Sequence, residues 1–297
     1  MNRLQCERER LESKLPWKSQ MKIHSDLLYG TAWKEADTQR CVRDALAAGF
    51  RAIDTANQRK HYFEQGVGDA IQAAIGIGTL ARSELFLQTK FTFLDGQDER
   101  LPYDKGADIT TQVHQSFESS LRNLRTDRID SLLLHGPSGR VGLGKSDWEA
   151  WKAMEEIART GKVGALGVSN VGLDQLQDFY SNADIKPRYV QNRCFATTGW
   201  DRAIRGFCKE HGLTYQGFSL LTANSQLFQQ SIVKRLVQQY RTTPAQLIFR
   251  FAKQIGIWPL TGTTNPEHMR EDLRSFSEPL SESDLEDLEM TFADAAG

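Results

Sequence analysis

Short runs of aliphatic residues alternate with longer stretches in which apolar residues recur every three or four positions, from about residue 27 to residue 273. Runs of the first kind are typical of buried strands, and the longer spacing is typical of helices that cover a sheet. Eight strands are predicted, at 27–31, 50–55, 85–90, 129–135, 163–169, 189–192, 214–218 and 257–260. Helices are predicted near 37–48, 67–78, 108–125, 147–160, 172–181, 200–211, 231–254, 266–273 and 281–291.

Several predicted helices begin beside a residue that can cap a helix. Short polar side chains accept hydrogen bonds from the free amides of a first turn, and this predicts caps at Asp37, Ser146, Asn265 and Ser281. Pro244 follows two threonines and suits a first helical position, so the 231–254 stretch is expected to form two helices.

Strands that are each followed by a helix favour a closed (β/α)8 barrel, a TIM barrel, over an open sheet. The chain has 297 residues, of which 39% are apolar and 25% charged, and this suits one domain of that size. No internal repeat, low-complexity tract or linker divides it. The barrel domain is expected over residues 21–297. Residues 1–20 are strongly charged and are expected to form a solvated leader, to which no function is assigned.

Charge and cysteine content narrow the classes of partner. Lys and Arg total 37 against 38 Asp and Glu, so no overall field attracts a nucleic acid or an anionic membrane. No apolar run approaches the roughly 20 residues that span a bilayer, and the start of the chain lacks the apolar stretch of a signal peptide. The four cysteines are scattered, without metal-ligand spacing. A cytoplasmic protein without a metal is expected, and its oligomeric state is not predicted.

Polar side chains gather where the predicted strands end. In (β/α)8 barrels the chemistry lies at the carboxyl ends of the strands. The polar residues at or just beyond these ends are Asp54, Lys90, His135, Ser169, Asn170, Gln191, Asn192 and Ser219. Eight such residues exceed what fold stability requires, so the functional site is predicted at this rim.

Four side chains on neighbouring strand ends and loops suit the reduction of a carbonyl group: Asp54, Tyr62, Lys90 and His135. A hydride that reaches a carbonyl carbon leaves an alkoxide, which needs a proton and a polarising donor. Tyr62 is expected to give the proton, and the Lys90 ammonium to lower the pKa of its phenol. Asp54 is expected to pair with Lys90, and a neutral His135 to donate a hydrogen bond to the substrate oxygen.

Each of these residues also has a structural interpretation when it is taken alone. An acid and a lysine at strand ends can form a structural ion pair, a lone histidine can be held by hydrogen bonds, and Phe218 can belong to the core. Only the order of the surrounding motifs favours the catalytic interpretation.

The order of these motifs resembles that of aldo-keto reductases over residues 27–290. The shared segments are GFRAIDTA, EQGVGDAI, SELFLQTK, DSLLLHGP, GKVGALGVSN and PLTGTTNPEHMRE. The resemblance implies that Asp54, Tyr62, Lys90 and His135 act as a tetrad on a small carbonyl substrate. It also implies a nicotinamide cofactor held at the barrel mouth without a Rossmann domain.

The resemblance assigns cofactor contacts residue by residue. Three positions look like contacts of the nicotinamide carboxamide: Ser169, Asn170 and Gln191. Phe218 matches the ring that stacks on the nicotinamide, and the positions that line the pyrophosphate are Ser219 and Leu221. The segment that holds the adenosine end contains Gly262, Thr263, Thr264, His268, Glu271 and Asp272. Trp33 matches a residue of the substrate pocket, although an aromatic plug at the barrel mouth is an equal alternative.

This chain departs from the family pattern in two loops. The loop after Asp54 is two residues longer than in many relatives, and a count back from Glu64 places His61 where the tyrosine is expected. Tyr62 is nevertheless chosen, because it is the only phenol of that loop. The tract that usually reads YSPL is FSLL here, and stacking needs only the ring.

NADPH is the expected cofactor, with NADH possible, because His268 stands where many relatives carry an arginine. The expected function is the reduction of aldehydes or ketones to alcohols. The alternative is a relative that binds the nucleotide without catalysis and reports redox state to a partner protein. Reduction of a conjugated C=C bond is a third class, in which relatives replace the tetrad histidine by glutamate, and His135 argues against it.

Overall fold

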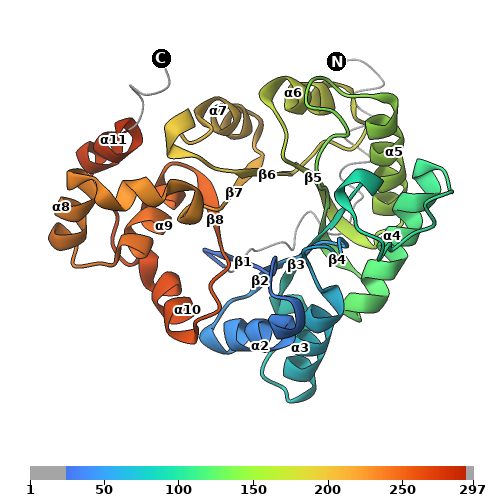
Figure 1. Cartoon of the computed structure of the whole chain (residues 1–297), viewed down its shortest axis with the longest axis horizontal. Helices are drawn as coiled ribbons and strands as arrows, with labels where there is room; N and C mark the ends of the chain where they lie inside the picture. The colour runs from blue at the N-terminus through green and yellow to red at the C-terminus, as the bar shows by residue number, and fades with distance from the viewer. Residues whose placement is uncertain (1–24, 292–297) are drawn as a thin grey trace, which may run out of the picture.

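The computed structural model describes residues 25–291, so the leader predicted at 1–20 lies outside the described residues. Within that range, eight parallel strands form a closed barrel in chain order, and β1 pairs with both β2 and β8. The helices surround the strands as an outer ring (Figure 1). The predicted (β/α)8 barrel is therefore confirmed.

The strands are β1 Leu28–Gly30, β2 Ala52–Asp54, β3 Phe86–Phe91, β4 Ile129–Leu134, β5 Val163–Ser169, β6 Tyr189–Arg193, β7 Thr214–Phe218 and β8 Ile257–Thr261. The α-helices are α2 Thr38–Ala48, α3 Glu64–Gly76, α4 Ile109–Leu124, α5 Lys145–Arg159, α6 Leu173–Asn182, α7 Arg202–His211, α8 Ser231–Gln239, α9 Pro244–Gln254, α10 Pro266–Leu273 and α11 Glu282–Met290. Short 3-10 helices lie at Glu35–Asp37, Arg82–Glu84, Leu94–Gly96, Ala196–Thr198, Thr222–Gln229 and Arg274–Phe276.

The helix starts follow the expected capping chemistry in most cases. The side chains of Asn265 and Ser281 cap α10 and α11, and α8 and α9 are separate helices with Pro244 at the start of the second. The cap predicted at Ser146 is wrong. Helix α5 begins at Lys145, two residues before the predicted start at 147, because the carboxylate of Asp147 accepts a hydrogen bond from the Gly144 amide at 2.7 Å. Asp37 precedes α2 without a capping hydrogen bond to it.

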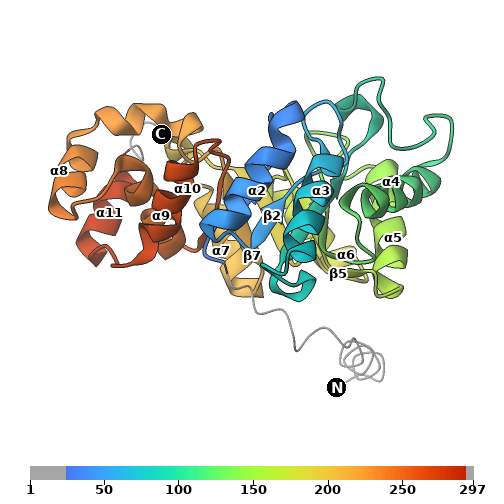
Figure 2. The same ribbon diagram turned by 90° about the horizontal axis from the view of Figure 1, so that it is seen from below.

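Helix α3 begins three residues before the predicted start at 67. Its first residue, Glu64, is buried, and its carboxylate accepts hydrogen bonds from Thr89 at 2.5 Å and Ser120 at 3.0 Å. The pattern of apolar residues does not predict that a glutamate is buried. Glu64 is buried because its carboxylate finds hydrogen-bond partners on β3 and α4. Helices α2 and α3 lie side by side against the barrel (Figure 2).

The barrel interior is layered. Alternate residues of a strand point to the same side, which places Phe86, Gln88 and Lys90 of β3 together inside the barrel. The lower layer is apolar, and there the ring centroids of Phe86 lie 5.4 Å from Tyr189 and 5.1 Å from Trp258. The layer above it is polar, so the apolar floor supports a set of charged and amide groups toward the carboxyl ends of the strands.

Candidate active site

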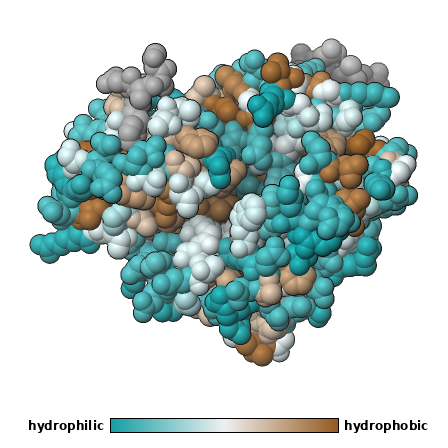
Figure 3. Space-filling view, in the orientation of Figure 1, coloured by the Kyte–Doolittle hydropathy of each residue, from teal (hydrophilic) through white to brown (hydrophobic). Residues whose placement is uncertain are grey.

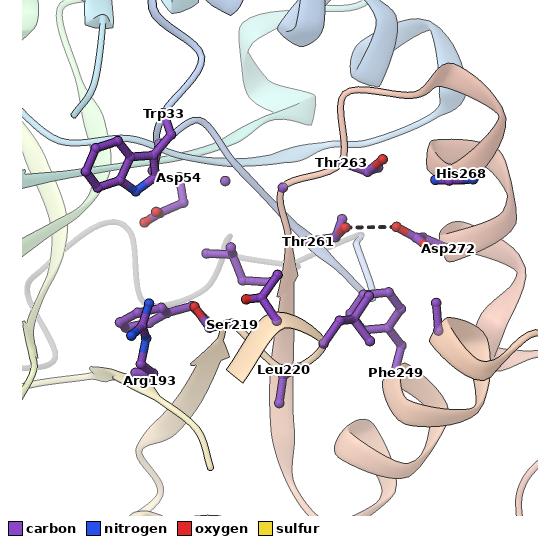
Figure 4. A pocket seen from close by; sticks show the side chains of 18 of the residues that line it. Trp33, Asp54, Arg193, Ser219, Leu220, Phe249, Thr261, Thr263, His268 and Asp272 are labelled. Atoms are coloured by element: carbon purple, nitrogen blue, oxygen red, sulfur yellow. Dashed lines mark hydrogen bonds between the residues drawn. The ribbon is translucent and has the colours of Figure 1, made fainter. Parts of the chain in front are cut away.

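A cavity of about 870 Å³ opens at the carboxyl ends of the strands. In the space-filling view, a hollow lies near the middle of the face that looks down the barrel (Figure 3). The site residues named from the sequence line this cavity, except Lys90 and Asn192. Figure 4 shows how side chains from β2, β7, β8 and α10 surround it. The fold thus brings together residues that lie more than two hundred positions apart in the sequence, such as Asp54 and Asp272.

The predicted pair of Asp54 and Lys90 is present and buried. Lys90 Nζ lies 2.7 Å from both carboxylate oxygens of Asp54 and donates a third hydrogen bond to the Thr55 carbonyl at 2.8 Å. Burial lowers the pKa of Lys90, and the charge of Asp54 opposes that effect. The ammonium therefore has all three donors in use, and the pair adds little net charge to the site.

Tyr62 lies beside this pair. Lys90 Nζ is 5.3 Å from the centroid of its ring, and the ring of His135 stands edge-on to it at 5.9 Å between centroids. In the free protein the net shift of the phenol pKa is upward, and the lowering effect expected of Lys90 stays a prediction. Burial raises the pKa of Tyr62, and the Asp54 carboxylate raises it further. The phenol therefore keeps its proton before substrate arrives.

His61, the other candidate in the long loop, has different neighbours. Its ring stacks on Trp33 with centroids 3.9 Å apart, and its Nδ1 is 2.9 Å from the Gln58 side chain. The ring of Tyr62, and not that of His61, contacts the Lys90 ammonium in this structure.

His135 is neutral, as expected. Burial lowers its pKa to about 3, and the positive charge of Lys90 contributes. Its Nδ1 lies 2.7 Å from the hydroxyl of Thr92. A hydroxyl that donates to Nδ1 leaves the proton on Nε2, the nitrogen that can then donate to a substrate oxygen. The sequence reasoning missed Thr92, although it lies two positions after Lys90 and so faces the same side of the chain.

The residues assigned to the nicotinamide end are held by hydrogen bonds among themselves. Ser169 Oγ donates to the Gln191 carbonyl at 2.6 Å, and Asn170 Nδ2 donates to the His135 carbonyl at 2.7 Å. Asn170 adopts φ 52°, in the left-handed region that asparagine tolerates better than most side chains. These bonds tie the end of β5 to β4 and β6, while Phe218 lies at the end of β7 on the same cavity.

The residues assigned to the adenosine end surround the start of α10. Thr261 donates to Asp272 at 2.8 Å, and Asn265 caps the helix beyond Gly262–Thr264. Burial raises the pKa of Asp272 to about 6. Figure 4 shows Thr263, His268 and Asp272 on one side of the cavity.

Lys34 was not identified from the sequence, yet it lines the same cavity. Its side chain is buried, Nζ donates to the Gly262 carbonyl at 2.9 Å, and no carboxylate pairs with it within residues 25–291. Burial lowers its pKa to about 8. A buried cation without an acidic partner is costly unless an anion binds beside it. Its position just after β1, at the carboxyl end of a strand, is the sequence feature that could have identified it as a site residue.

A second cavity of about 680 Å³ shares Trp33, Tyr62 and His135 with the first. It is also lined by Phe93. Trp33 is exposed, with 72% of its surface accessible. Its ring lies at both cavities, so a contact with substrate and a plug at the barrel mouth both stay predictions.

Other kinds of site are not found in the described part of the chain. Residues 25–291 contain no group of three or more side chains that could bind a metal. Cys41, Cys194 and Cys208 are free and buried. No helix in this range has the length and apolar character needed to cross a membrane.

Comparison with known proteins identifies the family of this chain. The sequence pattern of the Aldo/keto reductase family matches residues 26–291. The uncharacterized oxidoreductase YtbE of Bacillus subtilis is 30% identical over 245 residues, which cover 82% of this chain and 80% of that protein. Methylglyoxal reductase DkgA of Yersinia pestis is 29% identical over 84% of this chain and 82% of its own length.

Solved structures share the fold. The aldo-keto reductase MGS-M4 from a deep-sea metagenome library superposes with a TM-score of 0.77 at 24% identity, and the match covers 92% of both chains. The family match spans nearly all described residues and includes every residue of the site. This chain therefore belongs to the aldo/keto reductase family and is an oxidoreductase that acts on carbonyl compounds.

Proposed function

We propose that this protein reduces an aldehyde or ketone with NADPH, and that Tyr62 donates the proton. The observation that carries the proposal is the group formed by Tyr62, neutral His135 and the Asp54–Lys90 pair beside one cavity. Relatives named methylglyoxal reductase and glyoxal reductase support a small carbonyl substrate. Two structural neighbours are complexes with NADP or NADPH, which supports the cofactor.

The residues of the cavity fit a nicotinamide dinucleotide. Phe218 offers an aromatic face at one end, next to the amide and hydroxyl groups of Ser169, Asn170 and Gln191. Lys34 offers a buried cation for a phosphate, together with the polar residues Ser219 and Thr263. When bound, the nicotinamide supplies the hydride.

The residues of this chain supply the proton and stabilise the phenolate that its loss leaves. Tyr62 is held protonated by burial and gives the proton of its Oη to the substrate oxygen. His135 donates from Nε2 to the same oxygen, since Thr92 occupies Nδ1. The Lys90 ammonium stabilises the phenolate that remains, and Asp54 keeps the ammonium in place.

Substitution of Tyr62 by phenylalanine tests the proposal. With 4-nitrobenzaldehyde as the substrate, Tyr62→Phe should lower the rate of NADPH oxidation at least about 100-fold. General acid catalysis contributes a factor of about that size to the rate. Cofactor binding, measured by fluorescence titration, should change little. His61→Ala is the matched control and should retain most of the activity. If His61→Ala abolishes turnover while Tyr62→Phe does not, the proton donor is misassigned.

The assay also separates the alternative class. A wild-type protein that binds NADPH but does not turn over aldehydes would favour a nucleotide-binding sensor. Turnover of a conjugated alkene without turnover of aldehydes would favour C=C reduction.

A further inference from the structure

Three glutamines lie inside the barrel, between the apolar floor and the site. Gln88 on β3, Gln191 on β6 and Gln216 on β7 are almost completely buried. Gln88 Nε2 donates to Asp54 Oδ1 at 2.7 Å and to Gln216 Oε1 at 2.8 Å. Gln191 Nε2 donates to the same two acceptors at 3.0 and 2.9 Å, and Gln216 Nε2 donates to Gln88 Oε1 at 3.0 Å. We call these three residues the glutamine network.

The direction of every bond in the glutamine network follows from Asp54. An ionised carboxylate only accepts hydrogen bonds, so Gln88 and Gln191 must both turn their NH₂ groups toward it. Gln216 then meets two NH₂ groups and must present its oxygen to them. Its own NH₂ group finds the oxygen of Gln88. One charged group thus determines the orientation of three amides.

Gln191 connects the glutamine network to the cavity. Both protons of its Nε2 are used inside the network, so its Oε1 is the end that remains for a ligand. Gln191 lines the cavity, and its Oε1 is not among the buried unpaired atoms of the described residues. The side chain therefore offers the cavity a hydrogen-bond acceptor and not a donor.

We propose that Gln88 and Gln216 are positioning residues that, together with Asp54, hold the Gln191 amide so that its Oε1 accepts a hydrogen bond from the carboxamide NH₂ group of the nicotinamide. The inference rests on the proposed function, because it takes this cofactor as the ligand. It couples the same carboxylate that holds Lys90 to the recognition of the cofactor.

Filling of space alone does not explain these glutamines. The layer below them is filled by Phe86, Tyr189 and Trp258, so apolar side chains can occupy this barrel. Buried amides are unfavourable unless each hydrogen-bonding group has a partner, and a fully paired network restricts its members to one arrangement. Each of the three amides has partners inside the network, and Gln191 Oε1 is left to be paired by a ligand.

A cofactor analogue tests the orientation of Gln191. In 3-acetylpyridine adenine dinucleotide phosphate a methyl group replaces the carboxamide NH₂, while the carbonyl remains. We expect the wild-type protein to bind NADP⁺ about 2- to 10-fold more tightly than this analogue, the effect of one neutral hydrogen bond. In Gln191→Leu the two dissociation constants should be nearly equal. Gln216→Leu and Gln88→Leu should move the ratio of the two dissociation constants at least halfway from the wild-type value toward that of Gln191→Leu.

Two controls separate orientation from stability. Gln112 is a buried glutamine on α4, outside the network, and Gln112→Leu should keep the wild-type ratio. Gln216→Asn keeps a polar amide but is too short to reach both partners, so it serves if the leucine variants do not fold. A purely structural role of the network would weaken the binding of NADP⁺ and the analogue equally.

The outcomes distinguish the two proposals. An unchanged ratio in folded Gln216 and Gln88 variants, or a wild-type ratio near one, overturns the inference and leaves the proposed function intact. Failure of the wild-type protein to bind either dinucleotide overturns the proposed function itself.

Discussion

Asp54 receives hydrogen bonds from Lys90, Gln88 and Gln191, which come from two different strands. This convergence explains how a buried carboxylate can remain a fixed acceptor, since hydrogen bonds and an adjacent cation both stabilise its charge. Burial has the opposite effect on Tyr62, where it favours the protonated phenol and raises the pKa. The nearby Lys90 ammonium is already paired with Asp54. The same small volume thus holds an ionised acid and a protonated phenol.

Removal of the ammonium tests the role of Lys90. Lys90→Met should lower kcat by at least about 100-fold, because the phenolate of Tyr62 loses the charge that stabilises it. The variant should remain folded but less stable by about 3 kcal/mol, since Asp54 keeps only its amide donors. Steady-state kinetics and urea unfolding measure the two effects. A folded variant with wild-type activity would remove Lys90 from the mechanism.

At the scale of elements, α10 carries residues that we assign to the adenosine end of the cofactor. His268 and Asp272 lie one helical turn apart on this helix and line the cavity together. A neighbouring cation favours a phosphate, and a neighbouring carboxylate disfavours it. The charge at this end of the cavity therefore depends on the protonation of Asp272.

We expect a modest preference for NADPH over NADH that is stronger at pH 6 than at pH 8. Asp272, whose pKa is raised to about 6 by burial, is ionised at pH 8 and half protonated at pH 6. Loss of this negative charge reduces repulsion of the 2′-phosphate as the pH falls. Fluorescence titration of both cofactors at the two pH values measures the ratio.

The variant Asp272→Asn is the control for this pH dependence. It removes the titrating carboxylate, so any change that persists belongs to another group, such as the phosphate itself. Tighter binding of NADH at both pH values would contradict the prediction.

The contact between α3 and α4 depends on Gly68. A Cβ atom added there would lie 2.2 Å from the Asn123 carbonyl oxygen and 2.8 Å from the Leu124 backbone. Backbone atoms cannot rotate away, so Gly68→Ala should destabilise the protein by about 2 kcal/mol or more. Gly206→Ala, on α7, meets no atom within 4 Å and should be neutral or slightly stabilising. Equal unfolding midpoints for the two variants would refute the packing argument.

At the scale of the whole molecule, closure of the barrel brings the carboxyl ends of the strands together around one cavity. The sequence reasoning predicted the eight strands and the separation of α8 and α9, because burial on both faces and the geometry of proline leave local patterns. It also named the residues around the cavity through motif order. It missed the start of α3 at Glu64 and the cavity residue Lys34, since their burial depends on partners far away in the chain.

The sequence by itself therefore determined the fold class and the family, because both depend on local periodicity and on the order of short motifs. Only the tertiary structure decided which side chains meet and how they are charged. It set the raised pKa of Tyr62, the Nδ1 partner of His135 and the direction of the amides in the glutamine network. Desolvation and hydrogen bonding depend on distances of a few ångströms between separate strands, and the closure of the barrel creates those distances.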